Sequence, residues 1–158
     1  MSYTNGLDDP TIFFNILTYT GDDSAKAFTG VGFAPDFNWT KVRSNGGSDQ
    51  FTHQLADSVR GTGKTLWSSE NDAESSNYSN GYINAFGSDG YTVTAGDSYN
   101  GVGRTYVSWN WKAGGSASSN TDGSITSSVS ANTTAGFSIV SYTGSGSTTS
   151  FGHGLGVA

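Results

Sequence analysis

The chain has no cysteine and few charged residues, and both shortages exclude classes of function. Without cysteine there is neither a disulfide framework nor a thiolate metal site or nucleophile. Seven lysines and arginines against thirteen aspartates and glutamates give a net charge of −6. Nucleic acid is therefore not an expected partner, because phosphate contacts require a stripe of Lys and Arg. No apolar run approaches the roughly 18 residues that a membrane-spanning helix needs.

The N-terminal residues also lack the features of a secretion signal. The segment MSYTNGLDDPT has neither a basic region nor an apolar region. We therefore expect synthesis in a cytosol and, if the protein acts outside a cell, release by another route. A length of 158 residues fits one domain with its own core.

Glycine, hydroxyl, amide and aromatic residues are what the chain has in quantity. There are 23 glycines, long Ser/Thr/Asn stretches and 13% aromatic residues, whereas strong helix formers are scarce. Aromatic and β-branched residues between Gly, Asn, Asp and Ser clusters are typical of strands and tight turns. A polar surface of this hydroxyl and amide type is common in extracellular adhesins and virus fibres.

Alternating patterns predict strands at the spacing of an antiparallel β-sandwich or barrel. The predicted strands cover residues 11–20, 36–43, 51–59, 64–70, 82–86, 90–96 and 105–113. A weaker alternation predicts a hairpin between residues 124–130 and 137–143, with residues 132–136 as its turn. A short helical turn is expected near residues 70–76. The fold class is therefore predicted to be an all-β, antiparallel β-sandwich with little helix.

The clearest strand, residues 105–113, has two very different faces. Val107, Trp109 and Trp111 lie on one face, and Tyr106, Ser108, Asn110 and Lys112 lie on the other. We interpret the valine and tryptophan face as the one that points into the core. The expected core also includes Ile16, Phe137 and Ile139.

One strand is written nearly twice, once at each end of the chain. Residues 14–21 read FNILTYTG and residues 137–144 read FSIVSYTG, about 123 residues apart. Further along, GVGFA (30–34) matches GLGVA (154–158). Chance similarity between sequences rich in Gly, Thr and Ser is the alternative explanation. The register of the aromatic residues favours a repeat unit that begins again at the C-terminus.

A C-terminal copy of a first strand cannot occupy the position of the first strand in its own domain. We therefore expect one sandwich domain over residues 1–143, in which residues 137–143 pair with residues 124–130. The tail, residues 144–158, is expected to reach out to the next subunit. Phe151 and Leu155 are its predicted anchors.

Several segments together resemble a known family. They are GVGFAPDFNWTKVRS, HQLADSVRGTGKTLWSSENDAES, FGSDGYTV, YVSWNWKAGG and NTDGSITSSVSANTTAGFSIVSYTGSG, with GHGLGVA at the end. In this order they resemble virion proteins of marine bacteriophages, of the tail-fibre-like or structural type, in which such units are often repeated. The resemblance implies a jelly-roll sandwich of the concanavalin or LamG type. It also implies a place in the virion and contacts with further copies or other virion proteins.

The sequence departs from the family pattern at three positions. Asn38, Thr40 and Asn110 replace apolar residues or cysteine. These replacements make their strand faces more polar and argue against burial. The first functional hypothesis is a structural subunit that associates with itself. The alternative is a lectin-like module that binds host-surface glycan, and no enzyme activity is expected.

Glycan binding usually needs an exposed aromatic platform beside amide and carboxylate groups. The aromatic residues considered for such a platform are Trp39, Trp67, Tyr78, Tyr82 and Tyr99. Core packing is the preferred explanation for Trp109 and Trp111, and it also explains Trp39. The predicted glycan-binding residues are therefore the loop tyrosines Tyr78, Tyr82 and Tyr99.

No catalytic or cofactor site is predicted. His53 and His153 have no second ligand or carboxylate partner at a useful spacing. Calcium is the metal to consider, since acidic pairs occur at residues 8–9, 22–23 and 70–74. No loop has the spaced acidic pattern of a calcium site, so solvated turn acids are the preferred interpretation.

The segment SVRGTGK (58–64) lacks the spacing of a phosphate-binding loop and is interpreted as a turn between strands. Arg60 and Asp57 are expected to form a solvated pair there.

Overall fold

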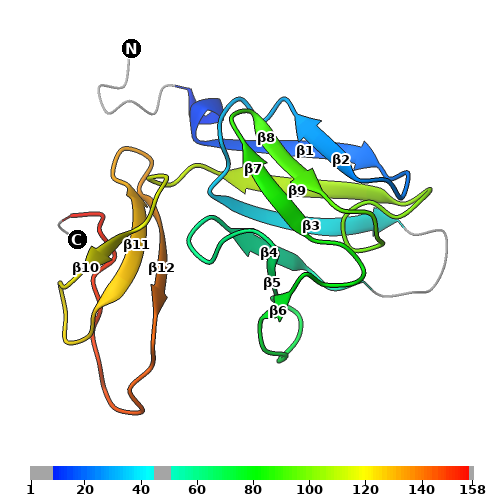
Figure 1. Ribbon diagram of the computed structural model, residues 1–158. Helices are drawn as coiled ribbons and strands as arrows, with labels where there is room; N and C mark the ends of the chain where they lie inside the picture. The colour runs from blue at the N-terminus through cyan, green and yellow to red at the C-terminus, as the bar shows by residue number, and fades with distance from the viewer. Residues whose placement is uncertain (1–8, 45–50, 157–158) are drawn as a thin grey trace.

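The computed structural model describes residues 9–44 and 51–156, which form a nearly all-β, antiparallel β-sandwich (Figure 1). The fold class is as predicted. The elements in chain order are η1 (Pro10–Ile12), a single 3₁₀ turn, and the strands β1 (Phe14–Thr20), β2 (Lys26–Thr29), β3 (Phe37–Ser44), β4 (Gln54–Asp57), β5 (Lys64–Trp67), β6 (Ser75–Ser76), β7 (Ile83–Gly87), β8 (Gly90–Val93), β9 (Thr105–Trp111), β10 (Ser118–Asn120), β11 (Ser127–Asn132) and β12 (Phe137–Tyr142).

Each predicted strand overlaps an observed one, and three short strands were not predicted. These are β2, β6 and β10, which have two to four residues. Each is a strand because it pairs with a neighbour: β2 with β8, β6 with β5 and β10 with β11. The predicted helical turn near residues 70–76 is wrong, because residues 75–76 pair with β5 instead. Within residues 9–44 and 51–156, no helix is long and apolar enough to cross a membrane.

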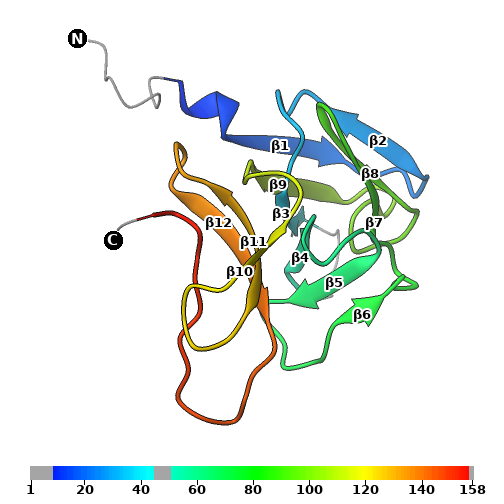
Figure 2. The ribbon, with the colours of Figure 1, turned by 60° about the vertical axis from the view of Figure 1, so that its left-hand side comes forward.

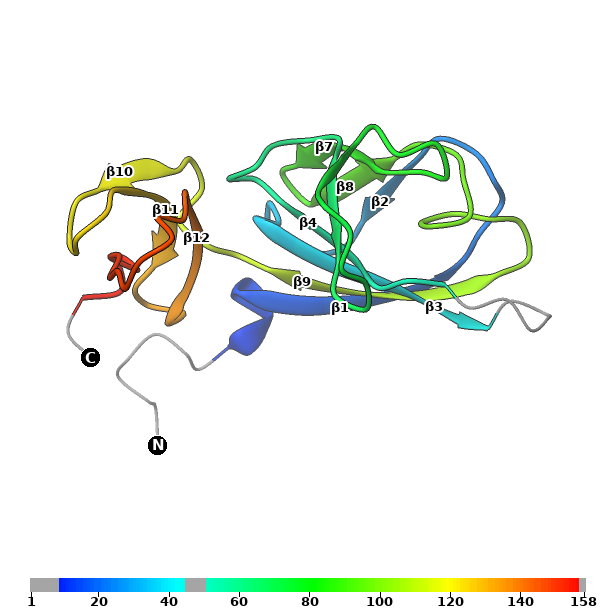
Figure 3. The same ribbon diagram turned by 90° about the horizontal axis from the view of Figure 1, so that it is seen from below.

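Two sheets form the layers of the sandwich (Figure 3). The six-stranded sheet has the order β1-β9-β3-β4-β5-β6, and the smaller sheet has the order β2-β8-β7. Their inner faces enclose an aromatic core, to which Leu17 and Tyr19 of β1 contribute at its edge. The buried members of this core are Phe28, Ala56, Ile83, Tyr91, Val93 and Tyr99.

The central strands β3 and β9 present polar side chains to this interior. Asn38, Thr40, Ser108 and Asn110 are all 0% exposed. Asn38 donates from Nδ2 to Oδ1 of Asn110 at 2.8 Å, and Thr40 donates to Oδ1 of Asn38 at 2.8 Å. Tyr91 of the facing sheet donates to Ser108 at 2.8 Å. The departures from the family pattern at Asn38, Thr40 and Asn110 are therefore buried, contrary to expectation, because they bond to one another and to their neighbours.

The predicted core face of β9 points outward. Val107, Trp109 and Trp111 are only half-buried, while Tyr106, Ser108 and Asn110 are buried. Ile16, directly paired with Trp109, is 46% exposed. The prediction failed because it ranked the two faces by hydrophobicity, whereas the smaller sheet packs on the face that carries hydroxyl and amide groups.

A third sheet lies beside the sandwich, with the strand order β10-β11-β12 (Figures 1 and 2). The predicted hairpin is confirmed, since β11 and β12 pair antiparallel over six residues. Phe137 and Ile139 of β12 are half-buried in this sheet and are not part of the sandwich core. The buried carboxylate of Asp36 fixes the connection to the third sheet by accepting from the backbone N–H groups of Ala113 at 2.8 Å and Gly115 at 3.2 Å.

The repeated segments make equivalent contacts in the two places. In the sandwich the ring of Tyr19 lies 4.0 Å from that of Phe28, and in the third sheet the ring of Tyr142 lies 4.1 Å from that of Phe151. Both β1 and β12 are edge strands that pair antiparallel with one neighbour. The similarity of the two segments therefore extends from sequence to packing.

The glycines of the two segments also match. Gly30 and Gly32 have φ values of +89° and +88°, and Gly154 and Gly156 have +73° and +86°. Such a backbone favours glycine, because an L side chain rarely adopts this conformation. Each copy thus turns away from its strand in a similar way.

The turn after β4 holds a buried ion pair, where a solvated one was expected. The side chains of Asp57 and Arg60 are 6% and 15% exposed, and Arg60 Nε lies 2.6 Å from Asp57 Oδ2. Arg60 also donates to Glu74 at 3.1 Å and to the Leu55 carbonyl at 3.1 Å. Burial raises the pKa of Glu74, but hydrogen bonds from Arg60 and Lys64 outweigh it, so the net shift is downward. The network ties the turn to the segment before β6.

The buried amides should contribute more to stability than the exposed apolar side chain that the sequence assigned to the core. Asn110→Ala leaves the buried amide of Asn38 without its acceptor, so we expect a loss of about 1–3 kcal/mol in the free energy of unfolding. Ile16→Ala should cost less than about 1 kcal/mol, because that side chain is nearly half exposed. Urea denaturation of both variants measures this. A larger loss for Ile16→Ala would show that the two faces are assigned the wrong way round.

Candidate functional site

The outer face of the six-stranded sheet carries a patch of large apolar side chains, which we call the tryptophan face. Its members stand in register on the three neighbouring strands β1, β9 and β3. One row pairs Trp111 with Phe14 and Phe37, and the next row pairs Trp109 with Ile16 and Trp39. The tryptophan face is defined as Phe14, Ile16, Phe37, Trp39, Val107, Trp109 and Trp111.

The rings of this face pack against one another at an angle. The Trp39 and Trp109 rings lie 5.9 Å apart, edge to face, and Trp111 lies 4.8 Å from Phe14 and 5.3 Å from Phe37. Between them the three tryptophans line a hollow of about 220 Å³. All its lining residues are tryptophans, so apolar contact is what it offers a partner.

Polar groups border the hollow on one side. Trp39 donates from Nε1 to Nδ1 of His53 at 2.9 Å, and Lys41 donates to the Phe51 carbonyl at 2.7 Å. Burial and the nearby charge of Lys41 lower the pKa of His53. A lowered pKa favours the neutral imidazole, whose Nδ1 lone pair accepts the indole N–H.

The third sheet covers one end of the tryptophan face. The Phe137 ring lies 6.1 Å from Trp111, nearly parallel to it, and 6.2 Å from Phe37. Trp39 and Trp109 lie farther along the strands, and among the described residues their rings contact no ring of the third sheet. Ile16 pairs with Trp109 in the same row and is 46% exposed. The open part of the face is thus the row that contains these three residues.

The predicted glycan-binding tyrosines do not form one surface. Tyr99 is fully buried, so its assignment to an exposed contact surface is wrong. It belongs to the sandwich core, where burial raises its pKa strongly. Tyr78 and Tyr82 are half-buried, and the Tyr78 ring packs edge-on against Trp67 at 5.1 Å. No ring pair in the described part of the chain joins Tyr78 with Tyr82.

The C-terminal tail folds back on its own third sheet and does not extend away from it. Phe151 forms a β-bridge with Gly123, and its ring stacks on Tyr142. Ser127 donates to the Gly152 carbonyl at 3.1 Å. Phe151 remains 39% exposed and Leu155 is half-buried, so their role as anchors for another subunit stays a prediction. Residues 157–158 lie outside the described residues.

Asp22 and both histidines are already engaged within the chain, His53 by the indole N–H of Trp39. Asp22 accepts from Ser24, Lys26 and Asn100, and these hydrogen bonds lower its pKa. Nδ1 of His153 accepts from the backbone N–H of Leu155 at 3.1 Å. Over residues 9–44 and 51–156, no three His, Asp or Glu side chains converge as metal ligands. Asp8, one of the calcium candidates, lies outside the described residues.

One signal in the sequence pointed to the tryptophan face. Lys41 and Arg43 share a face of the 36–43 strand with Phe37 and Trp39, and two cations along a strand mark a face that reaches solvent. The opposite face of that strand carries Asn38 and Thr40, whose polarity concealed its burial. No signal of this kind marks the third sheet, whose packing on Trp111 depends on how the connection at residues 113–115 is held.

Comparison with known proteins gives one match. Neither the curated proteins nor the solved structures provide a significant one. The family model of a domain of unknown function (DUF7483) matches residues 9–158, which include every described strand. The chain therefore belongs to the DUF7483 family.

Proposed function

We propose that this domain is a structural subunit of a bacteriophage particle, in a tail fibre or appendage, and that it associates with further copies of itself through the tryptophan face. The resemblance to marine phage virion proteins supports the setting, and a concanavalin-like jelly roll is part of the same proposal. The repeated segments, which make equivalent contacts in two places, support a chain built from related units.

The observation that carries the proposal is the open row of Ile16, Trp109 and Trp39 on the sheet surface. Trp is enriched among the residues that dominate binding energy at protein interfaces. A large contiguous apolar patch is rare on the surface of a monomeric protein and marks a contact site. A second copy is the partner we infer, because an apolar face needs no opposite charge and two such faces can bury each other.

A binding role is proposed in preference to catalysis. His53 uses Nδ1 to accept from Trp39, and His153 accepts from its own Leu155. The buried carboxylate of Asp57 is paired with Arg60. An acid–base mechanism needs a titratable group free to exchange a proton with substrate, and these groups are committed to the fold.

Replacing the central tryptophan of the face should weaken association. Trp109→Gln removes the largest apolar contact of the open row, so the dissociation constant of the assembly should rise at least about tenfold. Trp67→Gln is the matched control, since Trp67 is also half-buried but lies outside the tryptophan face. Mass photometry and light scattering over a concentration series measure the assembly. A wild-type chain that stays monomeric at high micromolar concentration would refute the proposal, as would equal effects of the two variants.

The three-tryptophan hollow favours a second candidate, a glycan-binding module. Indole rings are a frequent platform for sugar rings, and the hollow of about 220 Å³ is open at the surface. A glycan array is the direct test. Binding that is lost in Trp39→Ala and retained in a Tyr78→Ala/Tyr82→Ala variant would place a sugar on the tryptophan face. The reverse pattern would restore the loop tyrosines as the site, and an array without binding would exclude this candidate for the glycans tested.

A further inference from the structure

The free edge of β1 is the long strand edge that this fold leaves unprotected. We propose that β1 pairs, antiparallel and edge to edge, with β1 of a second copy. The inference rests on the proposed self-association and names a second contact for it, separate from the tryptophan face.

The backbone of β1 points half of its hydrogen-bonding groups away from the sheet. β1 pairs with β9 over all seven residues, and the backbone N–H of Gly21, next in the chain, donates to Arg104. Because the direction alternates along a strand, the N–H and C=O groups of Ile16, Thr18 and Thr20 face the free edge. The Ile16 N–H meets only the side chain of its neighbour Asn15, at 2.8 Å. In the described part of the chain, no other backbone group pairs with this edge.

The other sheet edges carry features that hinder pairing with another chain. β6 and β10 have only two and three residues, and β2 begins with Lys26. β7 has an irregular register between Ile83 and Ala85. Short strands, lysines and bulges are the means by which proteins protect their edges.

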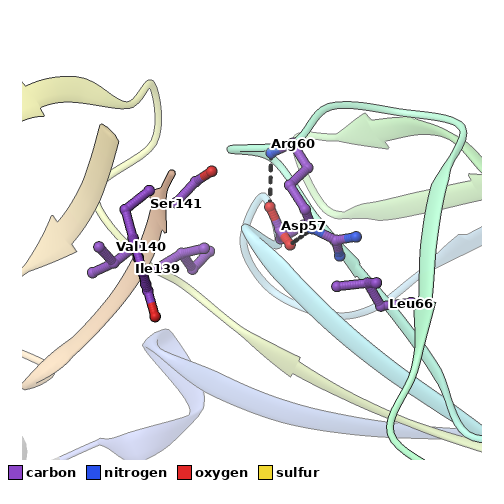
Figure 4. A pocket seen from close by; sticks show the side chains of 7 residues that line it. Asp57, Arg60, Leu66, Ile139, Val140 and Ser141 are labelled. Atoms are coloured by element: carbon purple, nitrogen blue, oxygen red, sulfur yellow. Dashed lines mark hydrogen bonds and ion pairs between the residues drawn. The ribbon is translucent and has the colours of Figure 1, made fainter. Parts of the chain in front are cut away.

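β12, the copy of β1, is sheltered by the turn of the sandwich that faces it. Four consecutive residues, 139–142, line a hollow of about 300 Å³, and Asp57, Arg60 and Leu66 form its opposite wall (Figure 4). Consecutive residues alternate between the faces of a strand, so it is the edge of β12 that borders the hollow. The side chains of Asp57, Arg60 and Leu66 thus stand in front of this part of the β12 edge and hinder its pairing with another chain.

β1 has none of these protective features. Its sequence, FNILTYT, contains no charge and no proline, and its ladder with β9 has no shift in register. Apolar and β-branched residues dominate it, and such residues favour pairing with a neighbouring strand on either edge. Its residues Ile16, Thr18 and Thr20 are exposed. A long, flat, uncharged edge of this kind accepts another strand.

A second copy is the partner that the strand itself favours. In an antiparallel pair centred on Leu17, Ile16 stands opposite Thr18, Asn15 stands opposite Tyr19, and Leu17 meets Leu17 of the second copy, so no charged side chain is opposed. A twofold axis perpendicular to the sheet relates the two strands, so both tryptophan faces lie on the same side. Pairing through β1 and contact through the tryptophan face are then two distinct twofold contacts, so both can form in one assembly.

Proline at position 18 tests the pairing. Thr18→Pro removes an N–H that faces the free edge and leaves the ladder with β9 intact, whereas Thr18→Val keeps the N–H and the β-branched shape. We expect Thr18→Val to assemble like the wild type. Thr18→Pro should retain the circular dichroism spectrum of the wild type and form smaller assemblies by light scattering. Assembly of folded Thr18→Pro to the wild-type size would overturn the proposal.

Hydrogen exchange of the wild-type chain gives a test that needs no variant. The amides of Thr18 and Thr20 should exchange fast in dilute solution and slow down several-fold at concentrations where the chain assembles. Suppose that the wild-type chain assembles and that Trp109→Gln disperses the assembly. If the exchange of Thr18 and Thr20 does not slow on assembly, the β1 pairing is refuted and the tryptophan-face contact stands. A chain that never assembles would refute both.

Discussion

The pair of buried amides on β3 and β9 is the constraint on which the rest of the structure depends. Asn38 and Asn110 stand opposite each other at the centre of the six-stranded sheet and share a 2.8 Å hydrogen bond. Thr40, Ser108 and Tyr91 extend the bonding to the facing sheet. A buried amide without partners costs free energy, so these residues are stable inside only in this one arrangement of the strands. The network therefore fixes both the register of the central strands and the face that turns inward.

The tryptophan face follows from that choice. Side chains alternate along a strand, so once Asn110 and Ser108 point inward, Trp109 and Trp111 must point outward. The third sheet covers part of the outward face through Phe137, and the row of Ile16, Trp109 and Trp39 stays open. A fold that places amides inside and indoles outside has used its largest apolar groups for something other than its own core. This arrangement is the ground on which we propose a contact function for the face.

The repeated strand serves different purposes at its two positions. As β1 it supplies Leu17 and Tyr19 to the sandwich core and leaves its free edge open. As β12 it supplies Phe137 to the end of the tryptophan face, and the turn at Asp57 and Arg60 faces its edge. The same alternation of residues thus works in both places, because each copy has one neighbour strand and one aromatic ring from the segment that follows it packed on its tyrosine.

The sequence by itself determined the fold class, most of the strands and the hairpin of β11 and β12. Alternation and turn residues are local signals, and they hold whatever the rest of the chain does. Which face of a strand is buried is not local. It depends on which sheet packs against it, and for β9 that was decided by the bonding of Asn38, Ser108 and Asn110 across strands. The burial of Tyr99 and the folding back of Phe151 were likewise decided only in three dimensions, because their partners lie far away in the chain or in a loop without periodicity.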